Sequence, residues 1–212
     1  MKIRAPTFLL LAVVGFLLAA CLPDPATVVQ GRRIVVFGDS LTLQAEPHMS
    51  QFGVRTHASN STAPCDWLSS FARTVQSEQP THVVLAFTGN HLTPCMQGRA
   101  DTLKEMNDAY FYDLYLLASQ TTAQVSFVVP PYTKPNIDYP NTVFTNYAWH
   151  GDPSIGNTEC YLASFAPDHA RCDFQARDEL GQNWGFRLDD GVHLNSVGAE
   201  LYGNGLIAAA NW

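Results

Sequence analysis

Short apolar runs alternate with longer amphipathic segments along most of the chain. Continuous β-branched and aromatic runs are typical of strands buried on both faces of a sheet. Four such runs, the second weaker than the others, lie at residues 34–37, 53–57, 82–87 and 125–129. Amphipathic segments predict helices at residues 41–51, 66–77, 102–119 and 196–210. Because strands that alternate with helices favour crossover connections, the pattern predicts an α/β fold with a mainly parallel sheet and helices on both faces.

One long stretch departs from this alternation. Residues 130–179 are rich in Pro, Asn, Tyr and Asp, have little periodicity and carry Cys160 and Cys172. Fifty irregular residues are uncommon in a compact domain unless they serve function or are cross-linked. We therefore expect a disulfide-containing insertion that lies over the functional site.

The N-terminus has the pattern of an export signal. A basic start precedes an apolar run over residues 8–18, which is shorter than the roughly 20 residues of a membrane span. The following Leu18-Ala19-Ala20-Cys21 resembles the lipobox of bacterial lipoproteins, in which the cysteine is lipidated. The alternative is an ordinary signal peptide with Cys21 as a plain thiol.

This N-terminal pattern also predicts the domain organisation. Residues 1–20 would be a lipoprotein signal peptide, and residues 21–30 the lipidated cysteine and a short tether with two prolines. Residues 31–212 would form one domain. We expect the protein to be exported and anchored by lipid to the bacterial cell envelope, on its extracytoplasmic side.

Composition narrows the range of partners. The chain has 212 residues, 46% of them hydrophobic and 15% charged, with a formal net charge of −7. This balance excludes a disordered chain, which needs low hydrophobicity and high charge. An acidic surface repels phosphate backbones, so we expect no nucleic-acid partner.

Four cysteines remain after Cys21, and an even set in an exported chain indicates disulfides. Three pairings are possible from sequence alone. The short loop between Cys160 and Cys172 favours their pairing, which leaves Cys65 with Cys95. Cys65 and Cys95 each follow a strand-like segment, which places both at one edge of the sheet. A zinc site is the alternative, but no Cys-x-x-Cys or His-x₃-His spacing supports it.

Two loops that follow predicted strands carry reactive residue types. Gly38-Asp39-Ser40 places a serine at a helix start, where unpaired N–H groups favour developing negative charge. Its alternative reading is a helix N-cap, for which Asp and Ser are both preferred. Asn90 follows the strand at 82–87 and could donate its amide N–H to an oxyanion. Asn90 could instead be a turn residue.

A third loop precedes the last predicted helix. In Asp190-Gly191-Val192-His193, a turn lets the carboxylate hold one imidazole nitrogen while the other faces outward. The alternatives are a plain Asp-Gly turn with a solvated histidine, and orientation of His193 by Asp189 in place of Asp190.

Together, the order and context of Gly38-Asp39-Ser40, Gly89-Asn90 and Asp190-x-x-His193 resemble the SGNH hydrolases, the GDSL esterase/lipase family. The resemblance covers about residues 33–210. It implies a flavodoxin-like three-layer sandwich, Ser40 as nucleophile, His193 as base, Asp190 as its orienter, and no metal or organic cofactor. It also implies that the Ser40 N–H and the Asn90 amide are oxyanion donors.

The sequence departs from this family at one position. The family supplies a further oxyanion N–H from a glycine after the second strand, whereas residues 58–66 contain no glycine. A backbone N–H can come from any residue except proline, so Ser61 (or Asn60) is the candidate donor.

The resemblance implies a serine esterase that removes short acyl or acetyl groups from a small-molecule ester or an acylated glycan, such as a cell-envelope glycan or glycolipid. Two alternatives remain open. One is an acyltransferase to an envelope sugar, and the other is a non-catalytic glycan-binding lipoprotein that keeps the fold.

Overall fold

The computed structural model describes residues 22–90, 93–99, 103–131, 167–181 and 183–212. Its centre is a sheet in which every neighbouring pair of strands is parallel. The order across the sheet is β2-β1-β3-β4-β5. The strands are β1 (Ile34–Gly38), β2 (Arg55–Ala58), β3 (His82–Ala86), β4 (Gln124–Val128) and β5 (Ala170–Asp173). The predicted parallel α/β sheet is therefore confirmed, and each expected strand falls within two residues of its predicted start.

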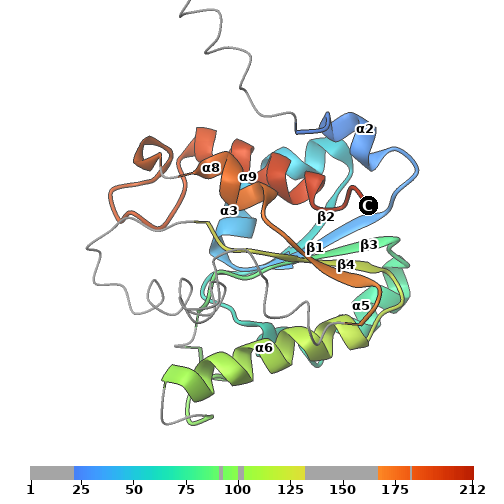
Figure 1. The fold of residues 1–212 in the computed structure, drawn as a ribbon, viewed down its shortest axis with the longest axis vertical. Helices are drawn as coiled ribbons and strands as arrows, with labels where there is room; N and C mark the ends of the chain where they lie inside the picture. Colours follow the sequence, from blue (N-terminus) through green and yellow to red (C-terminus); the bar gives the residue numbers. More distant parts are fainter. Residues whose placement is uncertain (1–21, 91–92, 100–102, 132–166, 182) are drawn as a thin grey trace, which may run out of the picture.

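Helices cover both faces of this sheet and make the fold a three-layer sandwich (Figure 1). One face carries α4 (Pro64–Trp67), α5 (Phe71–Glu78) and α6 (Leu103–Ser119). The other carries α2 (Pro25–Val29), α3 (Ser40–Met49), α8 (Gln175–Leu180) and α9 (Ser196–Ala208). The 3-10 turns η1 (Ser50–Phe52) and η3 (Trp184–Phe186) follow α3 and α8.

Alternate residues of each central strand enter different cores. Val35 and Phe37 of β1 belong to the core beneath α5 and α6. Ile34 and Val36 of the same strand belong to the core beneath α3 and α9. Burial of both faces explains why this strand reads as a continuous apolar run.

The helix predicted over residues 66–77 is wrong as one element, because two helices occupy this region. Pro64 starts α4 earlier, since proline fits the first turn of a helix. The N–H groups of Leu68 and Ser70 donate to the carbonyls of Cys65 and Trp67, three residues back. This tighter turn interrupts the i→i−4 ladder before α5 begins.

The insertion predicted over residues 130–179 extends too far. Its last part contains β5 and α8, which belong to the sheet and to its helical cover. β5 could not be predicted from an apolar run, because its sequence is Ala-Arg-Cys-Asp. It is an edge strand with only one neighbour, and such a strand does not need to be apolar throughout. Residues 132–166, including Cys160 of the predicted second disulfide, lie outside the described residues.

The segment expected as a tether, residues 21–30, contains the short helix α2. The Asp24 side chain accepts the N–H of Ala26 and caps α2, and Val28 is buried against the core beneath α9.

Residues 1–21, with the predicted signal peptide and Cys21, lie outside the described residues. In the part of the chain that is described, no helix combines the length and the apolar character needed to cross a membrane.

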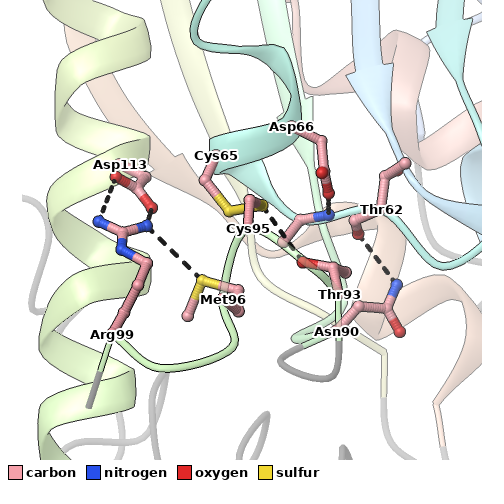
Figure 2. Close-up of a disulfide and its surroundings, with 10 residues drawn as sticks. Thr62, Cys65, Asp66, Asn90, Thr93, Cys95, Met96, Arg99 and Asp113 are labelled. Carbon is pink, nitrogen blue, oxygen red and sulfur yellow. Dashed lines mark hydrogen bonds and ion pairs between the residues drawn. A yellow bond between two sulfur atoms is a disulfide. The ribbon is translucent and has the colours of Figure 1, made fainter.

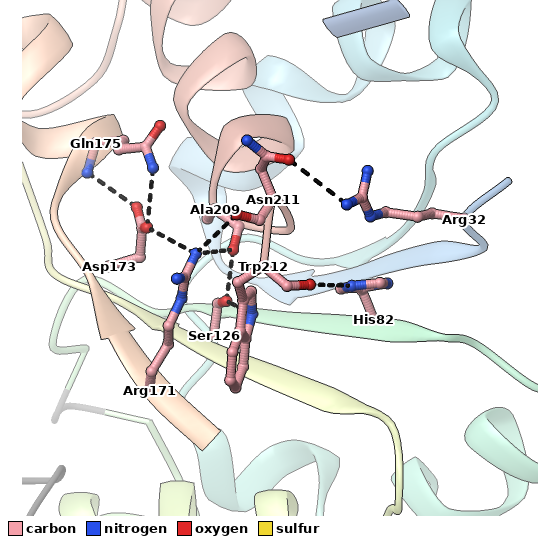
Figure 3. Close-up of polar contacts among 9 residues, drawn as sticks. All are labelled: Arg32, His82, Ser126, Arg171, Asp173, Gln175, Ala209, Asn211 and Trp212. Atoms are coloured by element: carbon pink, nitrogen blue, oxygen red, sulfur yellow. Dashed lines mark hydrogen bonds and ion pairs between the residues drawn. The ribbon is translucent and has the colours of Figure 1, made fainter. Parts of the chain in front are cut away.

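The last residue packs near the amino end of the strands, away from the loops described below (Figure 3). The Trp212 indole donates to Ser126 Oγ at 3.1 Å, and Arg171 lies 4.6 Å from the centre of the ring. His82 Nε2 lies 3.2 Å from the Trp212 carbonyl. Burial, above all, lowers the pKa of His82. These contacts cover the amino ends of the strands, at the end of the sheet away from the carboxyl edge.

Candidate active site

The turn that follows β1 places a hydroxyl at the start of α3. Asp39 is the N-cap of α3, and Ser40 is its first residue. At Gly38, a Cβ would lie 2.6 Å from the Ala86 carbonyl oxygen and would overlap Thr42. A glycine is needed at 38 so that α3 can pack this closely on β1 and β3. Ser40 is left half-buried at the carboxyl edge of the sheet.

Asp39 beside this serine is fully buried. One oxygen, Oδ1, accepts the Leu41 N–H at 3.2 Å. The other, Oδ2, accepts the Thr88 N–H at 2.6 Å, the Thr88 hydroxyl at 2.5 Å and the Asn90 amide at 3.2 Å. Burial raises the pKa of Asp39 to about 6, although the Thr88 and Leu41 donors and the nearby His193 oppose this rise.

His193 connects Ser40 to a second carboxylate. Its Nδ1 lies 2.7 Å from Asp190 Oδ2, and its Nε2 lies 3.2 Å from Ser40 Oγ. With the Nδ1 proton donated to Asp190, Nε2 is an acceptor for the Ser40 hydroxyl. The structure therefore brings together the three residues that the sequence analysis selected, and it places Asp190 in contact with His193.

Backbone N–H groups of the turn from Asp190 to His193 donate to the Asp190 carboxylate. Asp190 Oδ1 accepts the N–H groups of Val192 and His193, both at 2.9 Å. Gly191 between them has φ +67°, in the left-handed region that favours glycine. Burial acts to raise the pKa of Asp190, but these hydrogen bonds and the one to the His193 ring outweigh it and lower the pKa below its usual value. Asp190 is therefore an ionised partner for the imidazole.

Two further side chains hold this turn in place, one from α3 and one from the residues just before the turn. Gln44 of α3 donates to the Leu194 carbonyl at 3.1 Å and accepts the Leu194 N–H at 3.0 Å. Because Gln44 lies one helical turn after Ser40, this pair sets the spacing between Ser40 and His193. Buried Arg187 donates to the Val192 carbonyl at 2.7 Å, and burial lowers its pKa to about 10.

Asn90 lies at the end of the loop that follows β3. Its Nδ2 donates to Asp39 Oδ2 at 3.2 Å and to the Thr62 carbonyl at 3.1 Å. The amide thus joins the turn after β1 to the loops after β2 and β3. The two amide hydrogens of Asn90 therefore already have protein acceptors: the Asp39 carboxylate and the neutral Thr62 carbonyl.

Ser61 adopts the backbone conformation that a glycine favours. Its φ is +53°, a left-handed value that few residues other than glycine and asparagine adopt. The next residue, Thr62, has its hydroxyl within hydrogen-bond distance of the Gly38 and Ser59 carbonyls, at 3.2 and 3.0 Å. In the loop where the sequence lacks a glycine, Ser61 therefore has a backbone conformation typical of glycine.

Cys65 and Cys95 form the predicted disulfide, with their Cα atoms 6.0 Å apart (Figure 2). Within the described chain, the group of possible metal ligands consists of these two cysteines and Asp66. Sulfurs joined to each other do not provide thiolate ligands, so this group does not fit a metal ion.

The supporting roles of Gln44, Thr88 and Arg187 were not predicted from the sequence, and Asp39 was expected only as a helix cap. Gln44 carried a usable signal, since a residue four positions after Ser40 faces the same side of a helix. Thr88 carried none, because its role depends on a contact with Asp39, 49 positions away in the sequence. Arg187 acts within its own segment, on Val192 five residues later, but no motif distinguished it.

No protein-family model matches the sequence, and no relative is found among curated proteins. Solved structures do resemble the fold. A GDSL-like lipase from Bacteroides thetaiotaomicron has a TM-score of 0.57 at 16% identity, with 91% of each chain covered. An acetylxylan esterase from Geobacillus stearothermophilus has a TM-score of 0.56 at 14% identity, covering 86% of this chain and 95% of that one.

The C-terminal catalytic domain of a peptidoglycan O-acetyltransferase from Streptococcus pneumoniae is also similar. Its TM-score is 0.55 at 17% identity, with 84% of this chain and 91% of that chain covered. At these identities the likeness concerns the fold. The chain has the three-layer α/β fold found in GDSL-like lipases and acyl esterases, as the sequence resemblance implied.

Proposed function

We propose that this protein is a serine esterase of the SGNH type that hydrolyses acyl esters through an acyl-enzyme. The observation that carries the proposal is the chain of contacts from Asp190 to His193 to Ser40, with His193 Nε2 3.2 Å from Ser40 Oγ. A nucleophile, a base and an orienter in hydrogen-bond reach are what acyl transfer by serine requires.

The first half of the reaction transfers the acyl group to the enzyme. His193 Nε2 takes the Ser40 proton while Oγ attacks the ester carbonyl, and the carbonyl oxygen becomes an oxyanion. Asp190 stabilises the imidazolium that forms. As the tetrahedral intermediate collapses, His193 protonates the leaving alkoxide. The alcohol departs, and the acyl group remains as an ester on Ser40 Oγ.

The oxyanion is held by the Ser40 N–H at the α3 N-terminus, the Ser61 N–H and the Asn90 amide. An anionic oxygen is a stronger acceptor than a peptide carbonyl. The oxyanion therefore displaces the Thr62 carbonyl from Asn90, whereas the charged Asp39 keeps its hydrogen bond and holds the amide in place. Removal of one such donor typically costs on the order of 10²–10³ in rate.

In the second half of the reaction, His193 removes a proton from water, and the resulting hydroxide attacks the Ser40 ester. Collapse of this second intermediate releases the acid and restores the Ser40 hydroxyl. An acceptor hydroxyl from a sugar can take the place of water, which makes acyl transfer the second candidate. The similarity to a peptidoglycan O-acetyltransferase domain supports that candidate at the level of the fold.

The proposed substrates are short-chain or acetyl esters on cell-envelope glycans or glycolipids. Support comes from two similar structures, named an acetylxylan esterase and a peptidoglycan O-acetyltransferase. A lipid on Cys21 would hold the enzyme at the membrane beside such substrates. Metabolic labelling with a radioactive fatty acid tests the anchor: Cys21→Ser should lose the label and release the protein from membranes. Label retained by this variant would overturn it.

The hydrolysis of short-chain nitrophenyl esters by protein that lacks residues 1–21 tests the function. We expect turnover by the wild type and none above background for Ser40→Ala. Equal activity of the two proteins would contradict the assignment of the nucleophile. Product analysis with and without a glycan acceptor then separates hydrolysis from acyl transfer.

A further inference from the structure

The disulfide between Cys65 and Cys95 joins the two loops that carry the proposed oxyanion donors. Cys65 lies in α4, directly after the loop of Ser61, and Cys95 lies five residues after Asn90. The two loops follow β2 and β3, which are not neighbours in the sheet because β1 lies between them. Both cysteines pack against the core beneath α5 and α6, so the bridge joins the two loops on that face of the sheet.

The Cys65 end of the bridge is fixed to its own loop. The Asp66 carboxylate accepts the Ala63 N–H at 2.8 Å, and the Ala63 carbonyl accepts the Asp66 N–H at 3.1 Å. Ala63 is fully buried. A displacement of Cys65 therefore carries the preceding residues with it, including Ser61.

The Cys95 end is fixed to α6. The Thr93 carbonyl accepts the N–H groups of Met96 and Gln97 and closes a turn around Cys95. Arg99, at the end of this turn, forms an ion pair with Asp113 of α6, whose side chain is buried (Figure 2). This end is anchored to the helical layer and not to the sheet edge.

Between these anchors, the Asn90 amide donates to the Thr62 carbonyl at 3.1 Å. This contact joins the same two loops on the side of Ser40, and we have proposed that the oxyanion displaces it during the reaction. Once it is displaced, the covalent bridge is a remaining constraint that keeps the two loops at a fixed separation.

We propose that the Cys65–Cys95 disulfide is a positioning element of the oxyanion hole, which holds the Ser61 N–H and the Asn90 amide at the spacing that the tetrahedral intermediate needs. This inference rests on the proposed esterase function. Because misplacement of catalytic groups by about 1 Å can cost up to 10²-fold in rate, a loosened bridge lowers turnover without changing the nucleophile. Both cysteine residues are partly exposed.

The test replaces both cysteines by serine, in the wild-type and Asn90→Ala backgrounds, and measures kcat and KM on a short-chain ester well below every melting temperature. We expect Cys65→Ser/Cys95→Ser to lower kcat about tenfold with KM within about twofold. In the Asn90→Ala background the same change should cost little further, because one of the two donors is already absent. An unchanged kcat, or an equal proportional loss in both backgrounds, would overturn the inference.

Leu180→Ala is the matched control for lost stability. Leu180 is buried on the opposite face of the sheet, in the core beneath α9, so its truncation lowers the melting temperature without contact with either loop. We expect kcat of this control to stay within twofold of the wild type. A tenfold loss in the control would assign the effect of the cysteine variant to stability alone.

Hydrogen exchange distinguishes failure of this inference from failure of the esterase proposal. Exchange of the amides at residues 59–63 and 88–90 should rise in the cysteine variant, whereas that at 188–194 should not. If the wild type hydrolyses no ester, the esterase proposal fails while the exchange result still decides whether the bridge orders the loops. If the variant does not fold, wild-type protein reduced and alkylated in the folded state takes its place, and equal exchange before and after overturns the inference.

Discussion

The turn after β1 and the turn before α9 each place an aspartate beside a proposed catalytic residue, yet the two carboxylates have opposite environments. Asp39 is fully buried, and burial raises its pKa to about 6. The Asp190 side chain is 49% exposed, and its hydrogen bonds lower its pKa. Asp39 accepts hydrogen bonds from the start of α3 and from the loop after β3, whereas Asp190 accepts from its own turn and from the His193 ring.

This difference separates two tasks that the residue type alone does not distinguish. An exposed, ionised carboxylate can balance a charge that appears and disappears on His193 during each turnover. A buried carboxylate with several donors, one of them the Asn90 amide, is better suited to hold the geometry of a site. The comparison predicts that both aspartates matter for activity but that only Asp39 makes a large contribution to the pH dependence of stability.

The largest expected effect is that of Asp190→Asn on turnover. An asparagine amide cannot balance the charge of the imidazolium and favours the wrong tautomer of His193, so we expect kcat to fall on the order of 10⁴-fold. The melting temperature should change little because the side chain is half exposed. Asp189→Asn is the matched control, since this exposed neighbour makes no hydrogen bond or ion pair with His193 in the described structure, and steady-state kinetics should find it near wild type. A comparable loss in both variants would contradict a specific role of Asp190 in orienting His193.

Asp39→Asn should have the next largest effect on turnover. An asparagine cannot accept from all four of the donors that meet at Asp39, so either the Asn90 amide or the cap of α3 loses its acceptor. We expect kcat to fall on the order of 10²-fold, as for loss of an oxyanion donor. Labelling by a fluorophosphonate should slow in parallel. Wild-type kinetics in this variant would show that Asp39 has no role in positioning Asn90.

The pH dependence of the free energy of unfolding provides a second, independent test of the difference between Asp39 and Asp190. Because the pKa of Asp39 is about 6 in the folded protein and near 3.8 when exposed, the folded state retains a proton between those values that the unfolded chain releases. The free energy of unfolding therefore contains a contribution of about 3 kcal/mol that is present below pH ~4 and lost as the pH rises through about 6. Denaturant titrations at several pH values should find this decline in the wild type and not in Asp39→Asn. The same decline in both proteins would contradict the assignment.

Asp190 should change stability in the opposite direction and by less. Its lowered pKa in the folded state contributes stability above its ordinary pKa that is lost as the pH falls. Solvent screening at this half-exposed side chain keeps the contribution small.

The smallest effect is expected at the opposite end of the sheet. Trp212→Ala removes the indole hydrogen bond to Ser126 and the contact with Arg171, both near the amino ends of the strands. We expect a stability loss of about 1–2 kcal/mol with kcat unchanged. Thermal unfolding and ester hydrolysis measure the two effects. A large loss of kcat would show that the two ends of the sheet are coupled.

The positions of the candidate catalytic residues could be predicted because they depend on local order. Ser40 and Asn90 each follow a buried strand, and in a parallel sheet the carboxyl ends of the strands meet at one edge. Asp190 and His193 could be paired because only three positions separate them. The apolar runs of β1, β3 and β4 were readable for the same reason, since burial on both faces leaves a continuous signal.

What could not be predicted depends on contacts between distant segments. Asp39 does cap α3 as its residue type suggests, but its bond to Asn90 requires two loops that are 51 positions apart in sequence to meet. β5 lacks an apolar run because it is an edge strand. The left-handed conformation of Ser61 has no local signal either, since serine does not favour positive φ.

Whether Ser40 is a nucleophile activated by His193 and Asp190 can be read from the intact mass of the protein after reaction with a fluorophosphonate. We expect one adduct per chain, on the peptide that contains Ser40. We also expect no adduct for Ser40→Ala and much slower labelling for His193→Ala. An unmodified wild-type mass, or an adduct that persists in Ser40→Ala, would contradict this role of Ser40.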